Sequence, residues 1–74
     1  MELTQSVRLV RLPEVERRVG YRKSKIFGAV ATGAFPQPVR LGRVVAWVEG
    51  ELDAWINARI AERDARAAPR RRSP

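Results

Sequence analysis

The first regular pattern of apolar positions along the chain predicts a short helix over residues 13–19. Val15 and Val19 lie four residues apart and therefore share one helical face. Pro13 suits the first position of a helix, where its missing N–H group would have no partner. Gly20 suits the left-handed residue that follows a helix, so we expect the helix to end there.

A second helix is predicted over residues 23–32, where Ile26, Phe27 and Val30 form an apolar face that ends before Gly33. Only three residues separate it from the first helix. Two short helices joined by a glycine-containing turn of this length are typical of a helix-turn-helix unit. In such a unit the second helix lies in the major groove of DNA, with its N-terminal residues nearest the base edges.

Alternating apolar and polar positions then predict a β-hairpin. Two prolines keep residues 35–38 extended. Residues 39–41 alternate as a strand, the Gly-Arg pair at 42–43 makes a tight turn, and residues 44–47 form the return strand. Near the N-terminus, the weaker alternation of residues 7–12 fits either a short strand or an extended lead-in.

The last pattern predicts a third helix over residues 49–67, ended by Pro69. Its apolar positions form one stripe: Leu52, Trp55, Ile56 and Ile60. Both tryptophans could stack on bases, but Trp55 belongs to this stripe and Trp47 ends a strand, so we expect them in the core with Phe27. The order of elements predicts an α+β, mostly helical fold, a winged helix-turn-helix with a two-stranded hairpin as its wing.

Length and composition narrow the class of protein. The 74 residues form one domain, expected over residues 8–68, between a loose N-terminus (1–7) and a disordered basic tail (69–74). The chain has no cysteine and no histidine, which excludes disulfides and removes the commonest metal ligand and general base. We therefore expect no enzyme activity, catalytic residue, cofactor or metal. No segment approaches the roughly 20 apolar residues that span a bilayer, and the N-terminus lacks a signal-peptide pattern. We expect a cytoplasmic protein without a membrane partner.

The charge pattern indicates a nucleic acid as the partner. The formal net charge is +7 and the pI is about 11.5, which fits an anionic partner. Residues 17–43 contain seven basic residues and no Asp or Glu, whereas residues 48–64 contain five acids and two bases. A charged run is usually a solvated surface, but such surfaces mix signs, so we interpret residues 17–43 as an anion-binding face.

The predicted DNA-binding residues all belong to this basic stretch: Arg17, Arg18, Arg22, Lys23, Ser24, Lys25, Arg40 and Arg43. Lys23 and Lys25 stand in the first turn of the second helix, where the helix dipole disfavours cations, so an external anion is the expected compensation. Arg22 and these two lysines could contact either phosphates or base edges, and so could Ser24. The two wing arginines would contact the backbone.

Several short motifs stand in order along residues 8–63. They are Arg11-Leu12-Pro13-Glu14-Val15, Gly20, Ser24, Ile26-Phe27, Gly33-Ala34-Phe35-Pro36, Pro38-Val39-Arg40-Leu41-Gly42-Arg43, Trp47 and Leu52-Asp53-Ala54-Trp55-Ile56. In this set the sequence resembles the AlpA-type phage regulators, which overlap with small winged-helix excisionases and, more distantly, with the DNA-binding head of MerR proteins. The resemblance implies a winged-helix DNA-binding protein of a prophage or integrative element. Such proteins activate transcription of an integrase or related gene, or bend DNA to direct excision.

The second helix departs from the usual pattern of this family at three positions. Arg22 replaces an N-capping Ser or Thr, Gly28 replaces an Arg or Lys, and Thr32 replaces a Glu or similar polar residue. A missing cap costs about 1 kcal/mol, and a mid-helix glycine costs about 1 kcal/mol relative to alanine. We therefore expect this helix to be weak until packing and DNA complete it. Gly28 could mark a close approach of the helix to DNA, or simple drift.

Three functions remain open on the sequence. The first is a sequence-specific, double-stranded DNA-binding regulator of transcription, with RNA polymerase as a further partner. The second is an excisionase that bends DNA and contacts an integrase, and the third is an interaction module whose basic face meets an acidic protein. One short helix covers little DNA, so we expect a homo-oligomer on DNA.

Smaller questions also stay open. Tyr21 either covers the turn or contacts a phosphate. The acids at the start of the third helix either match its dipole or form a docking face for a partner. Arg70–Arg72 in the tail could add non-specific affinity.

Overall fold

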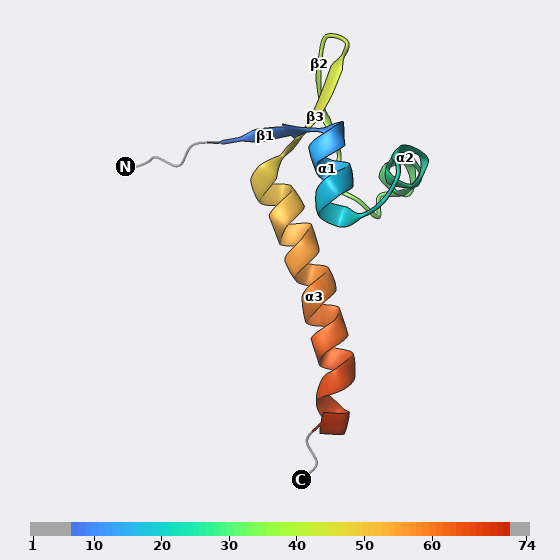
Figure 1. Cartoon of the computed structure of the whole chain (residues 1–74), viewed down its shortest axis with the longest axis vertical. Helices are drawn as coiled ribbons and strands as arrows, with labels where there is room; N and C mark the ends of the chain where they lie inside the picture. Colours follow the sequence, from blue (N-terminus) through green and yellow to red (C-terminus); the bar gives the residue numbers. More distant parts are fainter. Residues whose placement is uncertain (1–6, 72–74) are drawn as a thin grey trace, which may run out of the picture.

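The computed structural model describes the backbone of residues 7–71 and the side chains of residues 7–67. The elements are β1 (Leu9–Arg11), α1 (Leu12–Val19), α2 (Lys23–Thr32), β2 (Val39–Leu41), β3 (Val44–Val48) and α3 (Glu49–Arg71). The β2–β3 hairpin and α3 extend in opposite directions from the region where α1 and α2 lie (Figure 1). This is a winged helix-turn-helix, so the predicted fold class is confirmed.

The sheet has three antiparallel strands in the order β1-β3-β2. Leu9 lies opposite Val48 and Arg11 opposite Ala46, while β2 pairs with the other edge of β3. The alternative of a short N-terminal strand is therefore the one that the structure adopts, and the sheet has one strand more than the predicted hairpin. Because β1 runs directly into α1, this pairing holds the start of α1 beside the wing.

The core receives a large side chain from each helix, from β3 and from the α2–β2 connection. Its buried members are Val15, Ile26, Phe35, Trp47 and Leu52. The indole N–H of Trp47 donates a hydrogen bond to the Pro36 carbonyl at 2.9 Å, and that of Trp55 donates to the Ala34 carbonyl at 2.9 Å. The Phe35 ring stands edge-on to both indoles. Trp47 is thus confirmed as a core residue, and Trp55 packs half-buried against it.

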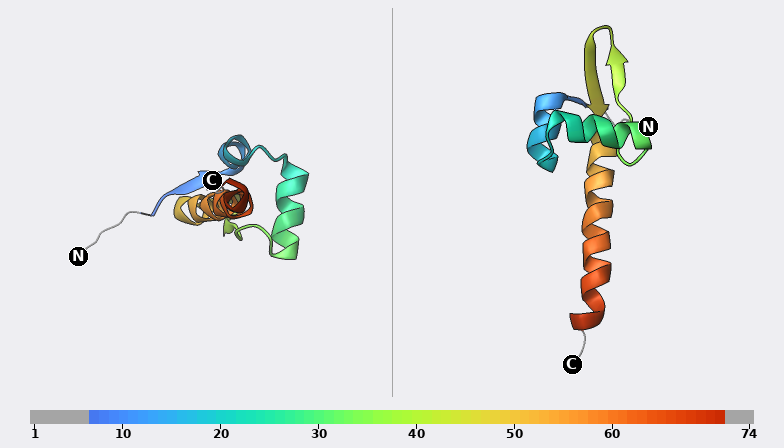
Figure 2. Two further views of the ribbon diagram at one scale, coloured as in Figure 1. Left: turned by 90° about the horizontal axis from the view of Figure 1, so that it is seen from below. Right: turned by 90° about the vertical axis from the view of Figure 1, so that its right-hand side faces the viewer.

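Glycines end both short helices, as predicted. Gly20 and Gly33 adopt left-handed conformations, with φ of 77° and 81°, which residues with a side chain adopt only at a cost. Helix α1 starts one residue earlier than expected, at Leu12, which places Pro13 in its first turn. Gly20 and the short connection that follows it lead the chain into α2, which lies across α1 (Figure 2).

The prediction that Pro69 ends the third helix is wrong, because α3 continues to Arg71. Pro69 lacks the backbone N–H group that would bond to the preceding turn. Arg70 and Arg71 have N–H groups of their own, so the helix can continue through them. Leu52 is fully buried, whereas Ile60 is 42% exposed, because α3 runs past α1 and α2 (Figures 1 and 2). The predicted apolar stripe therefore packs mainly at its start.

The structure describes only part of the two chain ends, where the sequence predicts a loose N-terminus and a disordered basic tail. The loose N-terminus and the end of the basic tail fall largely on residues 1–6 and 72–74, which lie outside the described residues. Arg70 and Arg71 belong to α3 rather than to a disordered tail. Within residues 7–71, no helix combines the length and apolarity that crossing a membrane requires.

Candidate nucleic-acid interface

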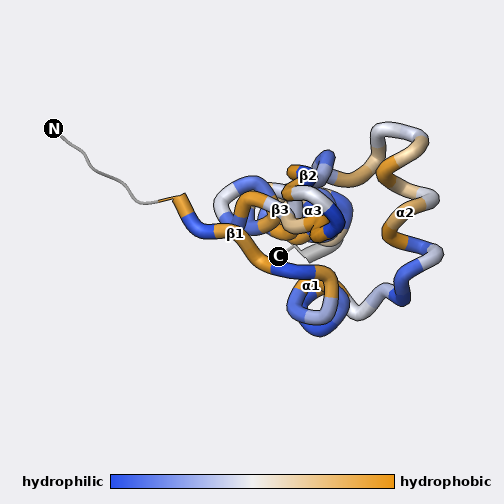
Figure 3. The backbone as a smooth tube through the Cα atoms, turned by 90° about the horizontal axis from the view of Figure 1, so that it is seen from above, coloured by the Kyte–Doolittle hydropathy of each residue, from blue (hydrophilic) through white to orange (hydrophobic). Residues whose placement is uncertain are grey.

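Helix α2 begins with a group of cations and no compensating acid. Arg22 precedes it with an extended backbone, φ −90° and ψ 169°, and its side chain makes no capping hydrogen bond. The first turn contains Lys23, Ser24 and Lys25, all exposed. Figure 3 shows this hydrophilic start against the more apolar remainder of the helix. The predicted absence of a side-chain cap is confirmed, and positive charge collects where the helix dipole is also positive.

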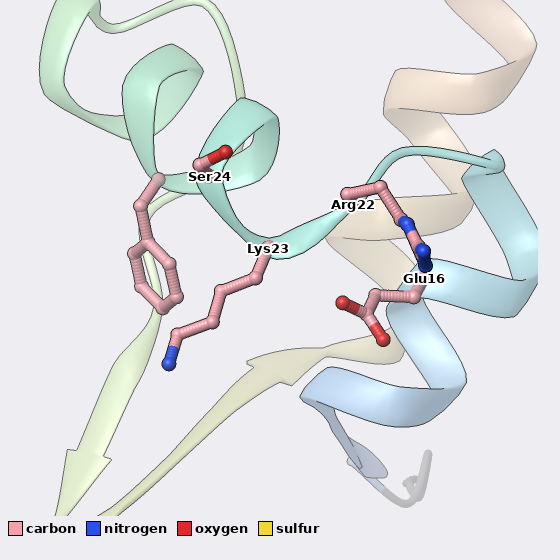
Figure 4. A pocket seen from close by; sticks show the side chains of 5 residues that line it. Glu16, Arg22, Lys23 and Ser24 are labelled. Carbon is pink, nitrogen blue, oxygen red and sulfur yellow. The ribbon is translucent and has the colours of Figure 1, made fainter.

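A first hollow, of about 460 Å³, lies between the start of α2 and helix α1. Its lining residues are Glu16, Arg22, Lys23, Ser24 and Phe27. In Figure 4 the side chain of Arg22 extends toward α1 beside Glu16, whereas Lys23 points away from it and Ser24 points to a third side. Glu16 therefore brings a negative charge to the surface that Arg22 borders, although residues 17–43 contain no Asp or Glu.

A second hollow, of about 290 Å³, joins the start of α2 to the wing. It is lined by Arg11, Leu12, Pro13, Lys23, Phe27, Arg43, Val44 and Val45. The structure thus brings together Lys23 and Arg43, two of the predicted site residues from different elements. Arg40, in contrast, is exposed on β2 and lines neither hollow.

Arg11 also lines the second hollow, although the charge pattern of the sequence does not indicate it as a site residue. It lies outside the basic stretch, at the end of β1, and is exposed. Its place beside the wing results from the pairing of β1 with β3, where it lies opposite Ala46. The one local signal is a cation placed just before the Leu-Pro start of a helix, which by itself indicates no partner.

The two arginines of α1 form ion pairs with carboxylates. Arg18 lies 2.7 Å from Glu49, 3.0 Å from Glu14 and 3.3 Å from Asp53, so it joins α1 to α3. Arg17 lies 2.7 Å from Glu14. Hydrogen bonds with Glu49 and then Glu14 raise the pKa of the Arg18 guanidinium. Two acids at the start of α3 therefore have an intramolecular partner, beyond the predicted match to the dipole.

These acids form an ion-pair cluster around an arginine and do not resemble a metal site. In the part of the chain that the structure describes, no three His, Cys, Asp or Glu side chains are grouped so that they could hold a metal ion.

Tyr21 and Lys25 lie together at the turn between α1 and α2. The Lys25 ammonium is 5.2 Å from the centroid of the Tyr21 ring, within range of a cation–π interaction. The Tyr21 ring in turn stands edge-on to Trp55, with centroids 6.2 Å apart. Tyr21 is half-buried, which supports the alternative that its ring covers the turn.

Beyond its first turn, α2 exposes only small side chains. Gly28, Ala31 and Thr32 are exposed, and the Thr32 hydroxyl donates a hydrogen bond to the Ala29 carbonyl at 3.1 Å. A Cβ atom added to Gly28 would meet nothing within 4 Å. Long polar side chains therefore stand only at the start of α2, and position 28 offers no side chain that could contact a base.

Comparison with known proteins identifies the family of the chain. The family described as "Prophage CP4-57 regulatory protein (AlpA)" matches residues 8–60, which run from the strand β1 into α3. The chain is also 41% identical over 63 residues to "Uncharacterized protein ORF88" of Enterobacteria phage P4, covering 84% of this chain and 70% of that protein. No solved structure is significantly similar to this chain. The chain belongs to the AlpA family of prophage regulatory proteins.

Proposed function

We propose that this protein is a sequence-specific, double-stranded DNA-binding regulator of transcription in a prophage or mobile element. The observation that carries the proposal is the position of Lys23 and Arg43 in one hollow, because it places the start of α2 and the turn of the wing on a common basic surface. In a winged helix such a surface spans the major groove and the adjacent backbone. Membership of a prophage regulatory family supports the same function.

The candidate residues divide by their surroundings. Arg22, Ser24 and Lys25 are exposed at the start of α2, where side chains reach base edges. Arg40 and Arg43 on the wing suit the backbone, whose contacts position a protein without reading sequence. Arg17 and Arg18 were also predicted to bind DNA, and we expect a smaller contribution from them. Their guanidinium groups already bond carboxylates, and the negative charge of those carboxylates opposes the approach of a phosphate.

Footprinting on the DNA that flanks the protein's own gene tests the proposal. We expect a discrete protected site, and fluorescence anisotropy should show tighter binding to that site than to a shuffled duplex. Arg22→Ala should weaken binding to the site by about 1–3 kcal/mol, the usual value of a base contact, with little effect on the shuffled duplex. Arg40→Ala should weaken both alike. Equal affinity for the two duplexes would contradict sequence-specific regulation and favour the interaction module.

The same site can separate a regulator from an excisionase. A circular-permutation assay reports whether the bound DNA is bent, and addition of an integrase reports whether it is recruited. We propose that several copies occupy one site, because the short α2 covers few base pairs. Analytical ultracentrifugation of the complex would count them. Strong bending together with integrase recruitment would favour the excisionase.

A further inference from the structure

The second hollow gathers three cations from three separate elements. Arg11 comes from the end of β1, Lys23 from the first turn of α2, and Arg43 from the turn of the wing. All three are exposed. The rest of the lining is apolar and consists of Leu12, Pro13, Phe27, Val44 and Val45. The hollow is therefore lined by both basic and non-polar side chains.

No carboxylate borders this hollow, which distinguishes it from the neighbouring one, where Glu16 lies beside Arg22. Among the described side chains, none of Arg11, Lys23 and Arg43 forms an ion pair. Elsewhere in the same part of the chain, Arg17 and Arg18 are matched with acids. Three like charges around one hollow repel each other, so an anion bound there would relieve the repulsion.

We propose that this hollow binds one phosphodiester of a DNA backbone strand together with its deoxyribose. The three cations would contact the phosphate oxygens, and the C–H groups of the sugar would pack against the apolar side chains of the lining. The inference rests on the proposed DNA-binding function and deepens it in two ways. It adds Arg11 to the interface, and it assigns Lys23 to the backbone, although its position in α2 alone would allow a base contact.

A bound phosphate here would position α2 in its groove. The hollow touches the starts of α1 and α2 and the turn of the wing at once, so one phosphate would set the position of all three elements relative to the duplex. Reading of bases would then be left to Arg22, Ser24 and Lys25, since Gly28 offers no side chain. Lys23 would supply affinity for any sequence.

The salt dependence of binding to a labelled duplex of arbitrary sequence tests the hollow, because each phosphate contact contributes about 0.9 to the slope of log K against log salt. We expect Arg11→Ala and Arg43→Ala each to reduce the slope measurably, but by less than the value of about 0.9 for a whole phosphate, because the remaining cations still contact it. Arg66→Ala is the matched control. Arg66 is exposed on the projecting part of α3 and lines neither hollow, and its loss changes the net charge equally. Circular dichroism melts would check that every variant is folded.

The double variant Arg11→Ala/Arg43→Ala tests whether the two arginines share one phosphate. A shared phosphate limits the combined loss to about 0.9, whereas two separate phosphates predict about 1.8, which would overturn the single-phosphate site. If Arg11→Ala behaves like Arg66→Ala while the parent protein binds the duplex, the hollow is wrong and the proposed function stands. If the parent protein does not bind the duplex at low salt, both are overturned.

Discussion

Arg18 and Glu49 form an ion pair with a nitrogen–oxygen distance of 2.7 Å, and this contact ties α1 to the first turn of α3. The two residues are 31 positions apart in the chain. Arg18 is the more enclosed of the two arginines of α1, with 29% of its side chain exposed against 70% for Arg17. It also bonds Glu14, so one guanidinium bridges carboxylates of two helices.

Replacement of this arginine should loosen the junction of α1 and α3. We expect Arg18→Met to lower the melting temperature more than Arg17→Met, because only Arg18 bonds a different element. Its loss leaves Asp53 without its partner and Glu49 with the more distant Arg8 alone. Methionine keeps an unbranched apolar stem, so the comparison isolates the charged group. Melts followed by circular dichroism at low and high salt would measure the difference, which screening should reduce. Equal melting temperatures would contradict a structural role for Arg18.

Glu14 predicts how the stability of the fold depends on pH. Hydrogen bonds from Arg17 and Arg18 lower the pKa of its carboxyl below the ordinary value of 4.5. The folded protein thus binds this proton less readily than the unfolded chain. The contribution is complete above about pH 4.5 and is lost as the pH falls through the lowered pKa. In urea unfolding at pH values from 3 to 7, Glu14→Gln should show a shallower loss of stability below pH 4.5 than the parent, and parallel curves would refute this.

The helices and strands could be predicted from the sequence where the residues that set their bounds are close together in the chain. Gly20 and Gly33 end their helices, and the bounds of α2 and β2 agree with the apolar spacing and the prolines between them. The site could be predicted only in part. Its charge pattern is visible along the chain, but the partners of each charge depend on packing between distant segments.

Two arginines show this limit in opposite directions. Arg18 lies within the basic stretch, yet folding places acids from α3 around it. Arg11 lies outside that stretch, yet strand pairing places it beside Lys23 and Arg43. A run of like charge along the sequence therefore identified a basic region but not which of its members remain available to an anion.

Arg22 should show a conflict between stability and binding. Its backbone is extended, as an N-cap residue requires, but its side chain does not cap α2. Arg22→Ser should therefore stabilise the protein by about 1 kcal/mol in chemical denaturation, while it weakens binding to the cognate duplex because the guanidinium is lost. Arg22→Ala is the control, since it removes the same charge without supplying a cap. If Ser and Ala give the same stability, the missing cap does not limit α2.

Gly28 should be replaceable by alanine with a gain in stability. It lies in the middle of α2 at an exposed position, and an added Cβ atom would meet nothing within 4 Å. Alanine restricts the unfolded chain and favours the helix, so Gly28→Ala should raise the unfolding free energy by about 1 kcal/mol. Gly33→Ala is the matched control on the same helix. Its φ of 81° is left-handed, so the same methyl group should destabilise the fold by about 1–2 kcal/mol.

The affinity of Gly28→Ala for DNA then decides what the glycine does. If α2 reads bases only with its first turn, the added methyl group has free space and binding to the cognate duplex should stay unchanged in anisotropy titrations. A large loss of affinity, in a variant that is more stable than the parent, would show that the backbone of α2 approaches the DNA too closely for a side chain. Position 28 would then be a contact made by the helix itself, and the restriction of base reading to Arg22, Ser24 and Lys25 would have to be given up.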